Sequence, residues 1–68
     1  MKLSKRKLSL AMANKSMLQR DLAKKSGLSY PSISKAIQEL DLSTRTVGQI
    51  ANALDVRVED LVLDQDKE

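Results

Sequence analysis

The sequence predicts an all-α fold of five helices, packed into one compact domain that spans residues 1–68. Three observations support this class. Apolar residues recur at spacings of three and four, and alternation of apolar and polar residues is not sustained over six positions. The chain has two Gly and one Pro, so few positions interrupt a helix. Its apolar fraction of 41% supports a core and lies far from the composition of disordered chains.

Local start and stop signals divide the chain into elements. Ser4, Ser29 and Ser43 each precede an apolar helical pattern and can cap a helix N-terminus. Gly27 tolerates the left-handed conformation of a helix C-cap, and Pro31 falls in a first turn, where its missing N–H costs nothing. The charged residues 64–68 are expected to fray. The helices are expected over residues 4–14, 18–25, 30–39, 44–54 and 58–62.

The helical periodicity also predicts the core. Gly48 breaks the pattern, because Gly inside a helix costs about 1 kcal/mol relative to Ala. It marks either a close helix contact or an exposed position. The residues expected to face inward are Leu8, Ala11, Met12, Leu22, Ala23, Ile33, Ala36, Ile37, Leu40, Val47, Ile50, Ala51 and Leu54.

Charge is distributed unevenly along the chain. Residues 1–38 carry nine Lys and Arg against one Asp, a net charge of +8. Residues 39–68 carry three Lys and Arg against eight Asp and Glu, a net charge of −5, which gives the total of +3. The first half suits a polyanion, although two solvated faces of opposite sign would have the same composition.

Several functional classes are excluded or disfavoured. Because the chain has no Cys and no His, it forms no disulfide, no Cys/His zinc site and no thiolate or imidazole catalyst. No motif activates its Ser or Lys residues, so we expect a protein that is not an enzyme and needs no cofactor. No apolar run approaches the roughly 18 residues of a membrane span, and a signal-peptide stretch is missing, so we expect a cytoplasmic protein.

The two helices around Gly27 are joined by about three residues, which is the spacing of a helix-turn-helix over residues 18–39. Ala23 allows the two helices to approach closely, Gly27 makes the turn, and Ile33 fills the angle between them. In this geometry the second helix can project into a DNA major groove.

These residues resemble the Cro/repressor-type (XRE-like, lambda-repressor-like) helix-turn-helix family. The resemblance is carried by residues 18–29 (LQRDLAKKSGLS) and continues through residues 50–56 (IANALDV). It covers residues 3–63 and implies a five-helix DNA-binding domain. Leu18 departs from the family pattern, because Thr or Ser is usual at this helix cap.

The resemblance implies that the exposed first turns of the third helix contact bases. Lys35 is the best candidate, because its ammonium can donate to guanine O6 and N7. Tyr30 can stack on a sugar or bond a phosphate, or it can pack on a neighbouring helix. The residues at the family's base-contact positions are Tyr30, Pro31, Ser32, Ser34 and Lys35.

The family also anchors DNA phosphates at the starts of two helices. Gln19 begins the second helix, whose N-terminal amides form an anion site. Arg45 is one of the few cations in the acidic half of the chain. The expected phosphate contacts are Gln19, Gln38, Thr44, Arg45 and Thr46.

A single domain of this size covers few base pairs, so we expect a homodimer that reads a palindrome of double-stranded DNA. Three consecutive apolar residues near the C-terminus cannot all face one small core; alternatively, Leu63 folds back over the first helix. The expected dimer surface comprises Val56, Val58, Leu61, Val62 and Leu63.

The leading hypothesis is therefore a sequence-specific transcriptional regulator, most simply a repressor. Two alternatives use the same fold. One is the antitoxin of a toxin–antitoxin pair, which binds both DNA and a protein partner. The other is a protein-interaction module without groove contacts, which the net charge of +8 in the first half disfavours.

Overall fold

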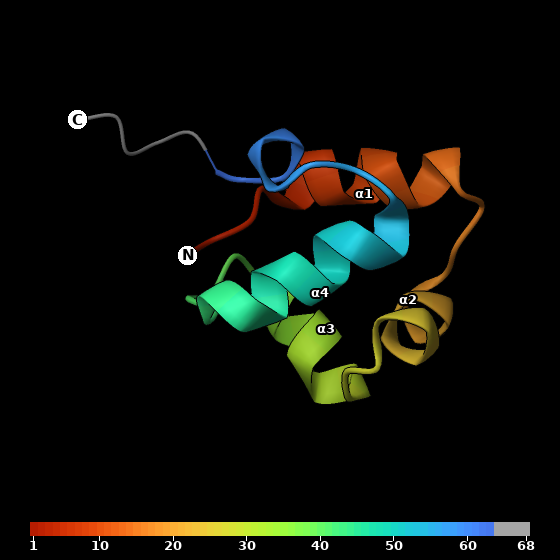
Figure 1. Cartoon of the computed structure of the whole chain (residues 1–68), viewed down its shortest axis with the longest axis horizontal. Helices are drawn as coiled ribbons and strands as arrows, with labels where there is room; N and C mark the ends of the chain where they lie inside the picture. The colour runs from red at the N-terminus through yellow and green to blue at the C-terminus, as the bar shows by residue number, and fades with distance from the viewer. Residues whose placement is uncertain (64–68) are drawn as a thin grey trace.

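The computed structural model describes residues 1–63, and the expected fraying of residues 64–68 lies outside them. The described chain is all-helical apart from one isolated β-bridge. Four α-helices are followed by a short 3-10 helix (Figure 1). In chain order these are α1 (Lys5–Asn14), α2 (Gln19–Ser26), α3 (Tyr30–Ile37), α4 (Thr44–Leu54) and η1 (Val58–Asp60).

Three of the helices begin at the predicted serines. The hydroxyls of Ser4, Ser29 and Ser43 each accept a hydrogen bond from the backbone N–H three residues later, at 3.2, 3.4 and 3.2 Å. Each bond satisfies one amide that the first turn of a helix leaves without an intrahelical partner. The starts of α1, α3 and α4 are therefore set by local sequence.

The predicted turn at Gly27 is confirmed. Gly27 has a φ of +78°, in the left-handed region that favours glycine. The backbone N–H groups of Gly27 and Leu28 both donate to the carbonyl oxygen of Ala23, each at 3.1 Å. This bonding closes α2 and redirects the chain into α3 within three residues.

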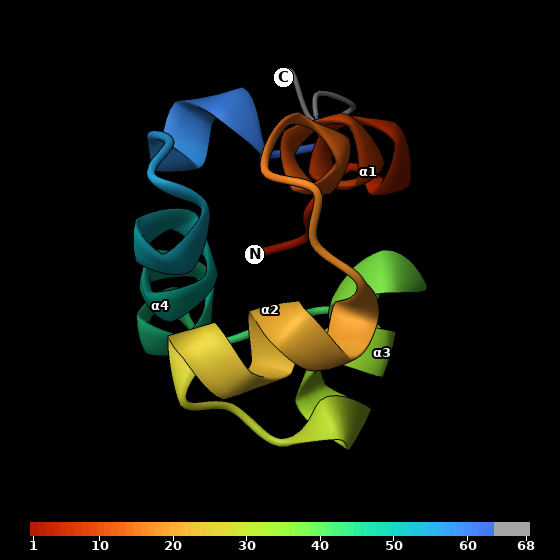
Figure 2. The ribbon, with the colours of Figure 1, turned by 90° about the vertical axis from the view of Figure 1, so that its right-hand side faces the viewer.

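The core lies where the inner faces of the four helices meet, with α1 at the upper edge and α3 at the lower edge of the molecule (Figure 1, Figure 2). Most of the residues predicted to face inward are buried. The buried apolar residues are Leu3, Leu8, Ala11, Met12, Leu22, Ala23, Ile33, Ala36, Leu42, Val47, Ile50, Ala51, Ala53, Leu54 and Leu61. No helix in the described part of the chain is long and apolar enough to cross a membrane.

The end of α3 differs from the prediction. The helix stops at Ile37 rather than at residue 39, and Leu40, predicted to be buried, is 44% exposed. Glu39 adopts a φ of +61°, and its carboxylate accepts a hydrogen bond from the backbone N–H of Lys5 at 2.9 Å. A contact between residues 34 positions apart therefore accompanies the early end of α3, and helical periodicity does not reveal it.

The predicted fifth α-helix over residues 58–62 is wrong, because only the three-residue η1 forms there. The following residues pair instead with the N-terminal segment, where Leu3 and Val62 form the antiparallel bridge. The N–H of Ser4 donates to the carbonyl of Leu61 at 2.7 Å, and the N–H of Leu63 donates to that of Lys2 at 3.0 Å. Backbone groups that would extend a helix are thus used in this pairing.

Gly48 lies inside α4 without a close neighbour. A Cβ atom built on it would meet nothing within 4 Å beyond its own helix. The structure therefore does not support a close helix contact as the reason for this glycine.

Candidate nucleic-acid interface

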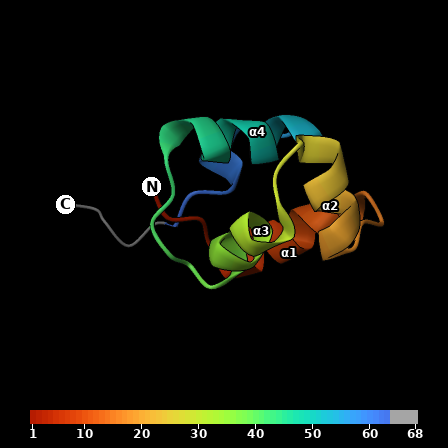
Figure 3. The same ribbon diagram turned by 90° about the horizontal axis from the view of Figure 1, so that it is seen from below.

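The outer side of α3 forms a polar stripe. Ile33 and Ala36 are buried in the core. Residues on the opposite side of α3 recur at helical spacing. Figure 3 shows the molecule from below, with α3 toward the viewer. We define this outer stripe as Pro31, Ser34, Lys35 and Gln38, of which Ser34 is half-buried and the other three are exposed.

Hydrogen bonds hold several of these polar side chains in place. The Nε2 atom of Gln38 donates to the hydroxyl of Ser34 at 3.0 Å. The hydroxyl of Ser32 lies 3.1 Å from that of the cap residue Ser29. Ser32 thus belongs to the start of α3 and lies on the flank of the outer stripe. Lys35 projects from the stripe as an exposed cation.

A shallow hollow of about 490 Å³ joins the start of α2 to the start of α3. It is lined by Leu18, Gln19, Arg20 and Tyr30. The structure therefore brings together Gln19 and Tyr30, which the sequence assigned to a phosphate contact and a base contact. Tyr30 is 52% exposed, so its ring is available to a ligand in this hollow.

The start of α2 is closed by a carboxylate rather than by a hydroxyl. The backbone N–H of Leu18 donates to Oδ2 of Asp21 at 2.9 Å, while the apolar side chain of Leu18 makes no capping bond. The first-turn amides of α2 point out of the helix end, where an anion is favoured. Gln19 is half-buried beside them.

The start of α4 provides the second predicted phosphate anchor. Thr44 and Arg45 are exposed in its first turn. Thr46 is half-buried, and its hydroxyl accepts a hydrogen bond from the hydroxyl of Ser43 at 2.9 Å. The exposed Thr44 hydroxyl and Arg45 guanidinium are accordingly the groups of this turn that a phosphate can reach first.

Two carboxylates between α3 and α4 are engaged by the N-terminal segment. Asp41 accepts a hydrogen bond from the amino group of Met1 at 2.8 Å, and this bond together with the positive charge lowers the pKa of Asp41. Glu39 accepts the Lys5 amide. The pKa of Glu59 is also lowered, by its own backbone N–H and by the Arg57 guanidinium, but Glu59 belongs to η1.

Sequence reasoning left Leu18 and Arg20 out of the site. Leu18 was noted only as a departure from the family pattern at a helix cap. Both line the hollow with Gln19 and Tyr30. The available signal was their position, because each is next to Gln19 in sequence.

The predicted dimer residues are distributed unequally. The side chain of Leu61 is fully buried, so it is not available to a partner. Val56, Val58, Val62 and Leu63 are half-buried.

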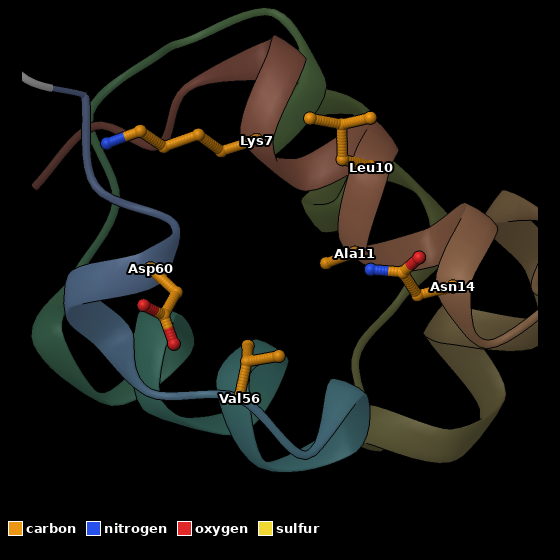
Figure 4. Close-up of a pocket in the computed structure, with 6 residues that line it drawn as sticks. All are labelled: Lys7, Leu10, Ala11, Asn14, Val56 and Asp60. Carbon is orange, nitrogen blue, oxygen red and sulfur yellow. The ribbon is translucent and has the colours of Figure 1, made fainter.

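Val56 lines a groove of about 290 Å³ together with Asp60 and one side of α1 (Figure 4). Leu10, 53% exposed, stands at the α1 side of this groove. The α1 residues that line it are Lys7, Leu10, Ala11 and Asn14.

The described residues contain no group of three or more acidic, His or Cys side chains that could hold a metal ion. The candidate interface on α2, α3 and α4 presents cations, hydroxyls, amides and two exposed side chains with large apolar surfaces, Leu18 and Tyr30.

The fold is similar to part of a longer solved protein. PhpD in its native form with cadmium atoms, and PhpD with cadmium complexed with hydroethylphosphonate, each superpose with a TM-score of 0.81 at 19% sequence identity. The match covers 98% of this chain and 15% of PhpD, so it shows the shared fold alone.

A sequence comparison with curated proteins finds no match. The family comparison is informative, because a model of the Cro/C1-type HTH DNA-binding domain matches residues 7–67. With its helix-turn-helix formed by α2 and α3, this chain belongs to the Cro/C1-type family of DNA-binding domains.

Proposed function

We propose that this chain is a transcriptional repressor that binds a palindromic operator in double-stranded DNA as a homodimer. Family membership supports DNA binding and transcription regulation. Repression follows most simply from occupancy, because a DNA-bound domain of this size can block polymerase without a second domain. Such a regulator would act in the cytoplasm and would need no cofactor.

The observation that carries this proposal is the outer stripe of α3 between two helix starts. Pro31 can touch a thymine methyl group, while Lys35 can donate to a guanine edge in the major groove. The starts of α2 and α4 offer Gln19 and Arg45 to the phosphates on either side. Phosphate contacts of this kind fix the register of a recognition helix, and Pro31, Ser34 and Lys35 of the stripe then read the sequence.

The proposed contacts divide into two groups by their expected effect. Base contacts are assigned to Tyr30, Pro31, Ser32, Ser34 and Lys35. Phosphate contacts are assigned to Gln19, Gln38, Thr44, Arg45 and Thr46. Loss of Pro31, Ser32, Ser34 or Lys35 should change which sequences are preferred, whereas loss of a member of the second group should weaken binding to all sequences. Tyr30 stands at the edge of the first group, because its ring can also stack on a sugar.

For the homodimer, we propose contacts through the exposed parts of four of the five predicted residues. These are Val56, Val58, Val62 and Leu63, since Leu61 is buried. Leu63→Glu should lower the number of chains bound per palindromic duplex from two to one, as measured by sedimentation. If wild type and variant both bind as two chains, this surface is not the dimer contact.

Selection of bound sequences from random duplex DNA tests the function directly. We expect an enriched palindrome whose half-sites are centred about 34 Å apart, or one helical turn. No enrichment over the starting pool would contradict sequence-specific binding. Capture of a toxin-like partner, together with an enriched DNA sequence, would favour the antitoxin alternative.

A further inference from the structure

Leu18 is exposed at a position where an apolar side chain is unfavourable. It is the N-cap residue of α2, and it is 59% exposed. Ser, Thr, Asp and Asn are preferred at this position because their side chains bond a first-turn amide, whereas the Leu18 side chain makes no such bond. A leucine here therefore gives up a capping bond and leaves a large apolar group in water. Local stability does not account for it.

A second exposed side chain with a large apolar surface lines the same hollow. Tyr30, at the start of α3, is 52% exposed and lines the hollow together with Leu18. Gln19 and Arg20 line it as well, so apolar, polar and cationic side chains occur together there. The start of α2 lies beside α3 (Figure 2). The combination differs from an ordinary anion site, which is built from donors and charges alone.

A DNA strand has the complementary chemistry, because its backbone alternates charged phosphates with deoxyribose rings whose carbon faces are apolar. Resting on the proposed function, we infer that Leu18 and Tyr30 hold one deoxyribose ring of the bound strand between the phosphates engaged by Gln19 and Arg20. This contact contributes affinity that depends neither on base sequence nor on salt. It continues the DNA interface of α3 onto the start of α2.

The test compares Leu18→Ser with wild type on the selected operator and on random-sequence duplexes of equal length. Serine restores the preferred cap, so the variant should melt about 4 °C higher than wild type. Its affinity should nevertheless fall about tenfold on both duplexes, because apolar contact is lost. The slope of log K against log salt should stay unchanged, since no phosphate contact is removed.

Leu10→Ser is the matched control. Leu10 is 53% exposed, and it stands beside the groove between α1 and Val56, away from the start of α2. The same substitution there should leave affinity for a duplex with a single half-site unchanged, because binding of one chain does not depend on the proposed dimer contact at Val56. Arg20→Ala should differ from Leu18→Ser in its salt dependence. Loss of a phosphate contact should lower the slope of log K against log salt by about 1.

Three results would overturn the inference. Unchanged affinity of Leu18→Ser would show that the side chain does not touch DNA. A loss confined to the operator, abolished when one thymine is replaced by uracil, would assign Leu18 to a thymine methyl group instead. A reduced salt slope would place its effect on a phosphate. Failure of wild type to bind any duplex would instead contradict the proposed function itself.

Discussion

Lys35 differs from its polar neighbours on α3 in what its side chain can offer DNA. Ser34 and Gln38 are bonded to each other, and Ser32 is paired with the cap residue Ser29. Their donors must leave these hydrogen bonds before they can bond to DNA. Lys35 is exposed, and its ammonium carries donors that match the paired acceptors of guanine.

We expect Lys35→Ala to relax base preference at one position of each half-site, at a cost of about 1–3 kcal/mol. Alanine favours the helix, so α3 should remain intact. Competition binding with operators altered at single positions measures the effect, and thermal unfolding serves as the folding control. An equal loss on operator and random DNA would make Lys35 a phosphate contact.

Replacing each of the two glycines by alanine should change the stability of the fold in opposite directions. Gly48 lies inside α4 with open space where a Cβ would stand, so Gly48→Ala should stabilise the fold by about 0.5–1 kcal/mol. Gly27 has a φ of +78°, so Gly27→Ala should cost about 1–2 kcal/mol although nothing lies within 4 Å of the new atom. Urea unfolding of both variants checks the pair. A destabilised Gly48→Ala would reveal a close contact that the structure does not show.

At the scale of elements, local signals predicted the helix starts well and some helix ends poorly. Ser29 and Ser43 were predictable because a cap acts on the three residues that follow it. The end of α3 is accompanied by a contact of Glu39, whose carboxylate accepts a hydrogen bond from the amide of Lys5, 34 residues earlier in the chain. Such long-range bonds leave no periodic trace in the sequence. The same reason explains why the pairing of Leu3 with Val62 was missed.

The candidate site was predictable to the extent that it follows the helix-turn-helix motif. The motif placed Gln19 and Tyr30 at two helix starts, and the structure brings them to one hollow. The motif did not assign Leu18 to this hollow. An apolar residue at a cap position is only a departure from the motif until the structure shows that its side chain is exposed.

The crossing of α2 and α3 depends on a small side chain. Ala23 is 7% exposed, and it lies at the α2 position from which its carbonyl closes the turn at Gly27. Ala23→Leu should overpack this crossing and destabilise the domain by about 1–3 kcal/mol, with a matching loss of DNA binding. Thermal unfolding measures the effect, and Ala13→Leu on the exposed side of α1 is the control. A normal melting temperature with full binding would contradict the role of Ala23.

Contacts from the two helix starts that flank α3 should contribute the same affinity for every DNA sequence. Arg45→Ala should weaken binding to operator and random DNA by the same factor and should reduce the salt slope by about 1. Gln19→Ala should also act equally on both duplexes, but with little change in slope, because an amide releases no counterion. Titrations at several salt concentrations distinguish the two. An unchanged slope for Arg45→Ala would remove this residue from the interface.

At the scale of the whole molecule, the uneven distribution of charge between the two halves of the chain matters, because the side that binds DNA approaches a polyanion. The acidic second half contributes Arg45 at the start of α4, whereas most of its carboxylates lie elsewhere in the chain. Asp41 and Glu39, the carboxylates closest in sequence to that helix start, are engaged by the N-terminal amino group and by the Lys5 amide. Their interactions moderate the repulsion that phosphates would meet there.

Pairing of two domains makes the spacing of half-sites a geometric test. In a two-fold dimer the copies of α3 enter successive major grooves on one side of the duplex, about 34 Å apart. Inserting about 5 base pairs between the half-sites rotates one of them by half a turn, onto the opposite side of the DNA. We expect affinity for the altered duplex to fall to that for a single half-site, whereas wild-type spacing retains cooperative binding by two chains. Gel-shift titration measures affinity for three duplexes: the palindrome, the palindrome with the insertion, and a single half-site. If the palindrome is bound equally well with and without the insertion, the domains bind independently.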